Sequence, residues 1–325
     1  MNTEKKQKNE KENSAAENIF ITADIIEKTQ FSMGQREQTE QWDIYTTAEA
    51  KISIATDRIN VHDRIVGCVP YKGAILGEIT AFFAELAADI CQTDFIATPH
   101  PRVILRKKVS VFPVSFRVHG YITSENNRKP NMWDQYKNGV KNYFGNLLPA
   151  GLKENQKLQR AALIPIVNKN ATTRETIYAE GLVDEALFEE AEEICLKLFS
   201  QASNHAQKQG LILASAKYTF GVAENQLLLL AGVHVPESAT YWDAKEYEKL
   251  FAENLPQKEL KETVINDWLA NVGFTGNGPA PPIPEEIKTK AAAEYQALTE
   301  QLLGKKIVLK KEMNSLEEME KTVKG

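Results

Sequence analysis

A fold that mixes helices and strands in two lobes is predicted from the length of the chain, its alternating segments and its helical stripes. The chain has 325 residues, 42% of them hydrophobic and 26% charged, which is enough for two substantial cores. Apolar and polar side chains alternate in residues 51–57 and again in residues 102–123, and this period of two predicts strands. Pro113 interrupts the second run, so we expect a sheet edge or a bulge there.

Helices are expected where apolar residues recur at helical spacing. Residues 77–90 carry one such stripe, made of Ile79, Phe82, Phe83, Leu86 and Ile90. A longer amphipathic helix follows Asp184, a suitable N-cap, and ends at Gly210. After the helix-breaking stretch GNGPAPPIPEE, a further helix runs to Gly304.

Two strand-like runs, LILASAKYTFG and NQLLLLAGVHV, lie between Leu211 and Val235 and are predicted to pair as a hairpin. The only carboxylate in this stretch is Glu224, in the expected turn. The two strands therefore offer no acidic side chain to a metal ion.

The two ends of the chain are rich in charge. Residues 1–17 lack the apolar core of a signal peptide, and we expect them to be a disordered arm. Residues 305–325 form a charged tail, for which a helix, a frayed end and a partner contact are all open.

Charge and cysteine usage narrow the class of protein. The net charge is −5 with both signs interspersed, which argues against a nucleic-acid or anionic-membrane partner. No apolar run approaches the ~18 residues of a membrane span. Cys68, Cys91 and Cys195 are odd in number and far apart, so they favour neither disulfides nor a zinc site. We therefore expect a cytoplasmic protein that acts on a small molecule, with homo-oligomer formation left open.

Several long strings occur in a fixed order along the chain: TDRINVHDRIVGCVPYKGAIL, VFPVSFRVHGYIT, MWDQYKNGVKNYFGNLLPAGLKENQKL, GLILASAKYTFG and VPESATYW. In this order they resemble the SAICAR synthetase family, the phosphoribosylaminoimidazole-succinocarboxamide synthases of purine biosynthesis, from about Asp43 to Gly304. The string with Trp133, Tyr136 and Tyr143 is similar to the longer variety of that family. We expect these three aromatic side chains to pack beneath a loop rather than to stack on a ligand.

The resemblance implies a two-lobed α+β fold, with a β-rich N-terminal lobe over residues 18–114 and a larger C-terminal lobe over residues 115–304. It also implies that a nucleotide is held between the lobes. Family members use ATP and magnesium to activate the carboxylate of a carboxyaminoimidazole ribotide, and the amine of aspartate then attacks the acyl phosphate. Such a site needs cations for phosphates and hard oxygen ligands for magnesium.

The segment that should cover the ATP phosphates departs from the family pattern. Residues 39–45 read TEQWDIY where the family has G-K-V-R-D-I-Y. The glycine, the lysine and the arginine are missing, and the carboxylate of Glu40 would repel a phosphate. This segment therefore predicts a weakened hold on a triphosphate.

The expected metal and ribotide positions depart from the family pattern as well. Ser215 and the pair Ala231 and Gly232 replace acids, while Thr240 replaces an arginine. Apolar side chains replace hydroxyls in residues 164–167. Each lost charge-assisted contact is worth ~1.5–3 kcal/mol, so we expect ordinary ATP-dependent ligation to be lost or altered. No cofactor is then expected, and ATP and magnesium are needed only if the family chemistry survives.

Ten residues are candidates for the substrate pocket because they match family motifs or occupy substituted substrate positions. They are Asp57, Arg58, Asp63, Lys72, His119, Asn155, Lys157, Lys217, Glu237 and Ser238. A buried structural pair is an equal alternative for Asp57 and Arg58. His119, at a family arginine position, could donate to an anion when protonated, whereas packing explains His62 and His234 better than a metal site does. We identify no catalytic residue and no metal ligand.

Three functions remain open. The first is an enzyme of the ligase family recruited to another small-molecule reaction, which we take as the main hypothesis. The alternatives are a working SAICAR synthase and a catalytically silent relative that binds a metabolite or a protein. Fold inheritance alone does not decide between them.

Overall fold

The computed structural model describes residues 19–20, 23–61, 64–124 and 131–324. The predicted arm over residues 1–17 lies outside them. The chain divides into two compact units. Unit 1 comprises Met1–Phe82, Phe95–Lys107 and Glu262–Gly325, and unit 2 comprises Phe83–Asp94 and Lys108–Lys261.

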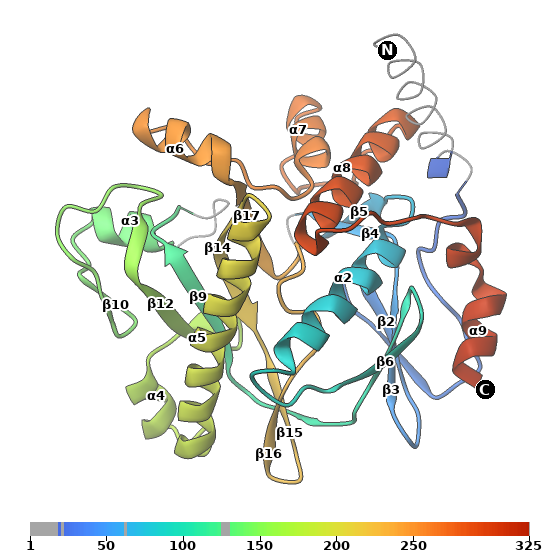
Figure 1. Ribbon diagram of the computed structural model, residues 1–325, viewed down its shortest axis with the longest axis horizontal. Coiled ribbons are helices and arrows are strands. Elements are labelled where there is room, and N and C mark those ends of the chain that lie inside the picture. The colour runs from blue at the N-terminus through green and yellow to red at the C-terminus, as the bar shows by residue number, and fades with distance from the viewer. Residues whose placement is uncertain (1–18, 21–22, 62–63, 125–130, 325) are drawn as a thin grey trace. The chain divides into compact units, whose positions relative to one another are not determined.

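Unit 1 is built on a five-stranded antiparallel sheet (Figure 1). Its strands, in spatial order, are β1 (Gln35–Gln38), β2 (Trp42–Thr46), β3 (Lys51–Ala55), β7 (Val103–Arg106) and β6 (Phe95–His100). The alternation predicted over residues 51–57 is present, because Ile52 and Ile54 in β3 are buried against Tyr45 and Val103. A separate ribbon pairs β4 (Arg58–Val61) with β5 (Arg64–Cys68).

Most helices of unit 1 come from its C-terminal stretch, residues 262–325. They are α7 (Thr263–Asn271), α8 (Glu285–Leu303), the 3-10 turn η2 (Lys311–Asn314) and α9 (Leu316–Lys324). Helix α2 (Lys72–Ala87), whose residues from Phe83 on are assigned to unit 2, begins five residues earlier than predicted, and Ile79 and Phe83 of its stripe are buried. Gly304 ends α8 in the left-handed conformation, as predicted.

Unit 2 is built on a second five-stranded antiparallel sheet. Its strands, in order, are β13 (Asn170–Ala171), β12 (Lys157–Val167), β9 (Ser115–Tyr121), β14 (Leu211–Tyr218) and β17 (Ala239–Asp243). Helix α5 (Glu185–Lys208) lies on one face, with the ring of Phe188 5.3 Å from that of Phe116 (Figure 1). The predicted N-cap is confirmed, because Asp184 accepts a hydrogen bond from the amide of Leu187.

Smaller elements complete unit 2. They are α3 (Met132–Lys137), α4 (Arg174–Ala179), α6 (Ala244–Ala252), the ribbon of β10 (Asn142–Tyr143) with β11 (Asn146–Leu147), and the sheet of β16 (Gln226–Leu229), β15 (Phe220–Ala223) and β8 (Ser110–Val111). Tyr136 and Tyr143 belong to a buried cluster, and Trp133 packs against it. The aromatic residues of the long string therefore pack as expected.

The predicted hairpin over residues 211–235 is wrong in its pairing. The hairpin is β15 with β16, and Glu224 and Asn225 form its turn with positive φ angles. Strand β14 instead pairs with β9 and β17. Residues 231–235, expected to be strand, are irregular. An apolar run has the same pattern whichever partner it pairs with, so the sequence could not distinguish these arrangements.

The two units divide the chain differently from the predicted domain limits at residues 114 and 304. Residues 262–304 belong to unit 1, where a Cβ at Gly67 would meet the side chain of Ile283. Arg64 likewise donates to the carbonyls of Gly276 and Gly278, at 2.7 Å each. A division into lobes contiguous in sequence remains a prediction.

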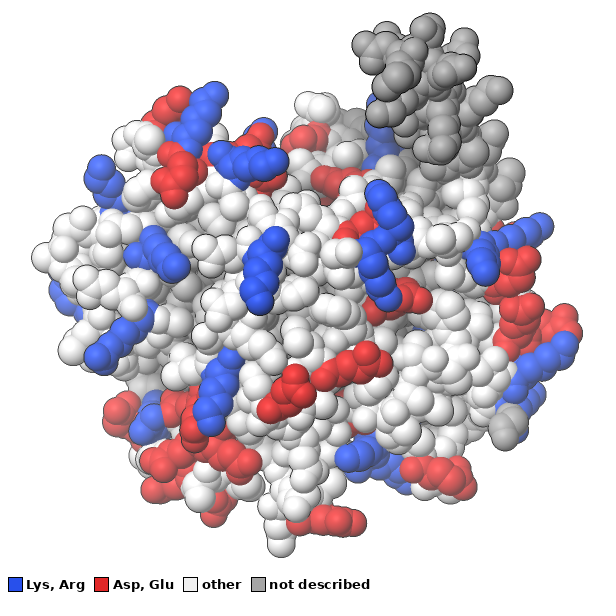
Figure 2. Space-filling view, in the orientation of Figure 1, with Lys and Arg blue, Asp and Glu red and all other residues white. Residues whose placement is uncertain are grey.

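The distribution of charge and the hydropathy of the helices agree with the composition. Lys and Arg side chains lie among Asp and Glu side chains on the face drawn in Figure 2, without a broad patch of one sign. No helix within the described parts of the chain is long and apolar enough to cross a bilayer.

Candidate functional site

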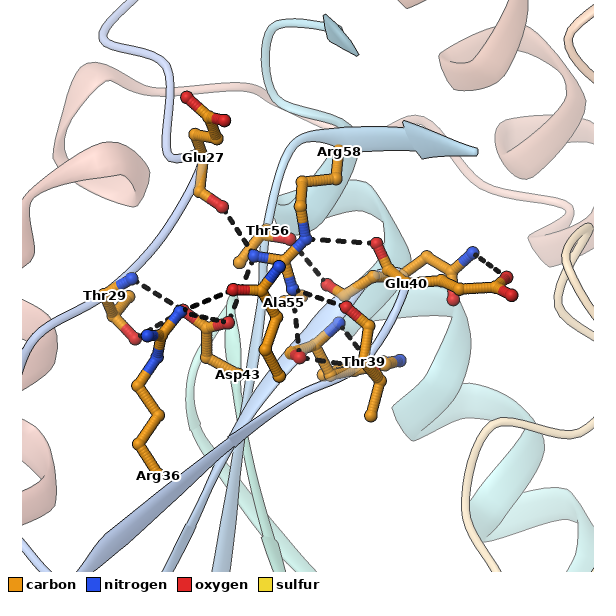
Figure 3. A network of polar contacts seen from close by, with 12 residues as sticks. Glu27, Thr29, Arg36, Thr39, Glu40, Asp43, Ala55, Thr56 and Arg58 are labelled. Carbon is orange, nitrogen blue, oxygen red and sulfur yellow. Dashed lines mark hydrogen bonds and ion pairs between the residues drawn. The ribbon is translucent and has the colours of Figure 1, made fainter. Parts of the chain in front are cut away.

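The Arg58 side chain is the centre of a buried polar network in unit 1 (Figure 3). Its Nη1 donates to a carboxylate oxygen of Asp43 at 3.1 Å and to the carbonyl of Glu27 at 2.6 Å. Nε donates to the carbonyl of Glu40, and Nη2 donates to those of Thr39 and Trp42. All the donor nitrogens of the guanidinium therefore bond within unit 1.

The turn over residues 39–42 is held from inside by this network. The carbonyl of Gln41, between those that Arg58 binds, accepts from both the amide and the hydroxyl of Thr56 at 2.8 Å. The amide of Thr39 also donates to the carbonyl of Trp42 across the turn. Every carbonyl from 39 to 42 accepts a hydrogen bond, so the segment aligned with the family's phosphate loop is a tightly tied turn.

Asp57 and Arg58 are both buried and ion-paired, but not with each other. Asp57 pairs with Arg102 at 2.9 Å, and both side chains are fully buried. Its two carboxylate oxygens also accept from the amides of Gly73 at 3.0 Å and Ile26 at 2.8 Å. The alternative of a mutual structural pair is therefore wrong in its partners, although both residues take part in structural ion pairs.

Lys72 precedes Gly73, whose amide donates to this carboxylate, and its side chain is fully buried. Its Nζ is 5.1 Å from the centre of the Tyr295 ring in α8, within the range of a cation–π interaction. A Cβ at Gly73 would collide with the guanidinium of Arg102 and the carbonyl of Ala55, so glycine is required there. Asp63, the remaining candidate of this motif, lies outside the described residues.

A second group of polar side chains crosses the sheet of unit 2. His119 in β9 lies opposite Ser215 in β14, and Ser215 lies opposite Thr240 in β17. The hydroxyl of Ser215 donates to that of Thr240 at 3.4 Å and accepts from Nη1 of Arg117 at 3.3 Å. Lys217 is opposite Arg117 in the same register. We call the side chains of Arg117, His119, Ser215, Lys217 and Thr240 the cationic row, because three of the five are basic.

Four further candidates belong to unit 2. The amide of Lys217 donates to the carbonyl of Ser238 at 2.8 Å, which places Glu237 and Ser238 at the end of the cationic row. Asn155 is buried, with a positive φ angle, and its carbonyl accepts from the hydroxyl of Tyr247 at 3.0 Å. Lys157, the first residue of β12, is exposed.

The candidates thus form two groups, one within each unit. Asp57, Arg58 and Lys72 belong to unit 1, where the first two form separate ion pairs. In unit 2, His119 and Lys217 lie on one sheet face, and the carbonyl of Ser238 accepts from the amide of Lys217. Their assignment to a substrate pocket stays a prediction.

His234 is a buried neutral side chain, as its expected packing role requires. Burial lowers its pKa from 6.5 to about 3. Its Nε2 is 2.8 Å from the hydroxyl of Tyr218, whose pKa burial raises. His62, considered with it for a metal site, lies outside the described residues.

Cys68 is likewise an unreactive group. Burial raises its pKa to about 12, so its thiol stays protonated at neutral pH.

The positions that the family motifs indicate for a magnesium ion offer few side-chain ligands. Ser215 and Thr240 offer hydroxyls, while Ala231 and Gly232 offer no polar side-chain atom. Across the described residues, no cluster of three His, Cys, Asp or Glu side chains could hold a metal ion. Since magnesium prefers carboxylate and water oxygens, these side chains do not fit a protein-held ion.

Comparison with known proteins defines the family. The family model described as SAICAR synthetase matches residues 41–281. The chain belongs to the SAICAR synthetase family. Among its SAICAR synthetase relatives, the phosphoribosylaminoimidazole-succinocarboxamide synthase of Bacteroides fragilis is 32% identical over 291 residues, covering 86% of this chain and 91% of that protein. The synthase of the same name from Legionella pneumophila is 30% identical over 295 residues, covering 87% and 92%.

Solved structures of SAICAR synthetases share the fold. A SAICAR synthase from Saccharomyces cerevisiae, complexed with SAICAR, aligns with a TM-score of 0.76 at 24% identity, covering 87% of this chain and all of that one. The predicted α+β SAICAR-synthetase-like fold is therefore confirmed. The named relatives favour the working-synthase alternative over recruitment to another reaction, our main hypothesis from the sequence.

Sequence reasoning missed three residues of these two groups. Asp43 and Arg102 are the actual ion-pair partners of Arg58 and Asp57. Arg117 belongs to the cationic row, and it could have been found because it precedes His119 by two residues in an alternating strand. For Asp43 and Arg102, no local pattern shows the pairing.

Proposed function

We propose that this chain is an amide-forming ligase of the SAICAR synthase kind, which joins the amine of aspartate to the carboxylate of a carboxyaminoimidazole ribotide. The observation that carries the proposal is the extent of the likeness. Synthases with this name match over 91–92% of their own length at 30–32% identity. Such coverage supports a whole enzyme of the family rather than one borrowed module.

The cationic row is the part of unit 2 best suited to an anionic substrate. Arg117 offers a planar guanidinium and Lys217 an ammonium, and each bonds well to a carboxylate or phosphate. Ser215, which accepts a hydrogen bond from Arg117, and Thr240, which accepts one from Ser215, add hydroxyl groups beside the two charges. We assign this row to the ribotide, with His119 as a further donor when protonated.

Among the requirements of this reaction, nucleotide binding is the one that the side chains at the family motif positions satisfy least well. ATP supplies the phosphoryl group that activates the carboxylate in this family. Since the motif positions of this chain do not fit a protein-held magnesium ion, we derive no step through that ion. The proposal assigns to the protein only the holding of the ribotide anion and the approach of the amine.

A second candidate function is favoured by the substituted positions. The turn over residues 39–42 lacks the family's lysine and arginine and is tied to Arg58 and Thr56. Ser215 and Thr240 replace a charged acid and a charged arginine. These changes support a relative that binds an anionic metabolite through the cationic row without gripping MgATP, either silent or recruited to another reaction.

Product formation by the purified full chain separates the two functions. The protein is mixed with ribotide, aspartate and MgATP, and the succinocarboxamide is measured by mass spectrometry. The ligase proposal expects product at an ordinary enzymatic rate. Absence of product, together with calorimetric binding of the ribotide and no binding of MgATP, would replace it with the second candidate.

Paired variants show whether any activity belongs to this site. Lys217→Met removes a charge of the cationic row and is expected to lower kcat/KM at least tenfold. Lys208→Met, an exposed lysine at the end of α5, is the matched control and should leave it unchanged.

The proposal extends to location and partners. We propose a cytoplasmic enzyme with a small-molecule substrate and no nucleic-acid or membrane partner, which the interspersed charges and scattered cysteines support. Homo-oligomer formation is a further expectation, to be measured by light scattering.

A further inference from the structure

The segment over residues 305–324, which we call the tail segment, lies beyond the residues matched by the family model. It is nevertheless part of unit 1. Met319 in α9 is fully buried and shares a core cluster with Ile26, Tyr45 and Val103. The tail segment is therefore built into the core beside the sheet rather than attached to its surface.

Asn314 is the polar anchor of the tail segment. It is 3% exposed, and its Oδ1 accepts from Nε of Arg102 at 3.1 Å and from Nη2 of the same guanidinium. Its Nδ2 donates to the carbonyl of Asp24 at 2.7 Å. Arg102 Nε also donates to the carbonyl of Met313 at 2.9 Å. One amide side chain thus joins the tail segment to a buried guanidinium and to the N-terminal part of unit 1.

The same guanidinium binds Asp57 through Nη2, the nitrogen that also donates to Asn314. Asp57 in turn fixes both ends of residues 69–73, because its carbonyl accepts from the amide of Val69 at 2.8 Å and its carboxylate accepts from that of Gly73. Tyr71, between these ends, has a φ angle of +61°. A bulky residue keeps such a conformation only when its surroundings impose it.

Lys72 is the chemically notable residue of this short segment. It follows Tyr71, and full burial beneath Tyr295 makes the position of its ammonium depend on the backbone of residues 69–73. A continuous set of contacts therefore runs from Asn314 through Arg102 and Asp57 to this backbone.

We propose that Asn314 is a positioning residue: through Arg102 and Asp57, the tail segment holds residues 69–73 and so places Lys72. Removing the Asn314 acceptor takes one partner from Nη2 of the buried guanidinium, while Nε keeps the carbonyl of Met313, and the guanidinium then shifts away from Asp57 toward another acceptor. The two fastenings of residues 69–73 loosen as a result. This inference does not depend on the ligase proposal, because it concerns backbone order and not turnover.

The contact between the tail segment and the rest of unit 1 is discontinuous. A cavity of about 370 Å³ is lined in part by His100, Pro101, Val308, Met313 and Glu318. This hollow borders the β6–β7 turn. Asn314 and Met319 are therefore separate points of attachment, and each can be tested alone.

Local opening of residues 69–73 is the quantity to measure, in the full chain. Asn314→Leu removes all three side-chain hydrogen bonds while keeping the number of side-chain heavy atoms. Asn314→Asp keeps the acceptor for Arg102, and Lys321→Gln in α9 is a surface control. Hydrogen exchange by mass spectrometry follows residues 69–73, and acetylation of Lys72 by acetic anhydride follows its exposure. Urea unfolding measures global stability.

For Asn314→Leu we expect exchange of residues 69–73 and acetylation of Lys72 to rise at least tenfold, with residues 211–218 unchanged. Asn314→Asp should restore most of the protection, and Lys321→Gln should match the parent protein. Unchanged exchange of residues 69–73, or an equal rise throughout the chain, would overturn the proposal. If Asn314→Leu does not fold, Asn314→Ser is judged by the same criteria.

Discussion

The motif residues of unit 1 and the cationic row of unit 2 use charge in opposite ways. In unit 1, Asp57 and Arg58 are buried, and their partners Arg102 and Asp43 are buried with them. In unit 2, Arg117 and Lys217 are half-buried on a sheet face beside hydroxyls. The comparison teaches that a motif residue can be kept because it holds the backbone, while the side chains for a ligand change around it.

The largest expected effect comes from breaking a buried ion pair of unit 1. Arg102→Leu leaves the carboxylate of Asp57 buried without its cation, and we expect a loss of about 3–5 kcal/mol in the free energy of unfolding. Urea unfolding measures it. Arg174→Leu, which removes a partly exposed pair with Glu192, should cost at most about 1 kcal/mol. Similar losses in both variants would contradict the structural role of the buried pair.

Arg58→Lys sharpens the same comparison while keeping the charge. A lysine cannot reproduce the planar set of donors that holds residues 39–42, so we expect a loss of about 2–3 kcal/mol. Hydrogen exchange of residues 39–42 should rise more than that of the unit 2 strands. A variant with full protection of this turn would show that Thr56 alone holds it.

In unit 2 the effect should fall on binding rather than on folding. Arg117→Met is expected to weaken ribotide binding by about 1.5–2 kcal/mol, or roughly tenfold to thirtyfold, with little change in stability. Calorimetry checks this, and Arg160→Met, an exposed arginine of β12, is the control. Equal binding by the two variants would remove the cationic row from the ligand site.

The smallest expected effect is a pH dependence of the buried neutral His234. Its folded pKa of about 3 lies below its ordinary value of 6.5, so the unfolded chain takes up the proton first. Its contribution to stability is therefore complete above pH 6.5 and declines as the pH falls from 6.5 toward 3. Between pH 6.5 and 5.5 the decline is about 1 kcal/mol. His234→Gln should flatten that part of the stability curve, and an unchanged curve would contradict the assignment.

The sequence predicted the elements that depend on neighbouring residues. Helix α5 has its cap at Asp184 and its end near Gly210 as expected, because caps and stripes are local signals. Strand β14 was assigned the wrong partner, because pairing with β9 and β17 joins residues far apart in sequence. The strings that resemble SAICAR synthetase gave the fold, which the relatives confirm.

The site region was predictable only in part. Asp57 and Arg58 stood out through their motif, but their partners lie 45 and 15 residues away. Arg117 could be placed on the face of His119 by alternation alone. The hydrogen bonds from Arg58 to the carbonyls of residues 39–42 could not be predicted, because the sequence does not specify the direction of the Arg58 side chain.

The composition of unit 1 from separate stretches of chain sets an order for its assembly during synthesis. The ribosome makes residues 108–261, the bulk of unit 2, before it makes Asn314 and Met319. The core cluster of unit 1 that includes Met319 is therefore incomplete while most of unit 2 has already been synthesised. Part of the apolar face of the unit 1 sheet stays uncovered during that time. Until α9 has been synthesised, the exposed apolar surface to which a chaperone could bind lies in unit 1.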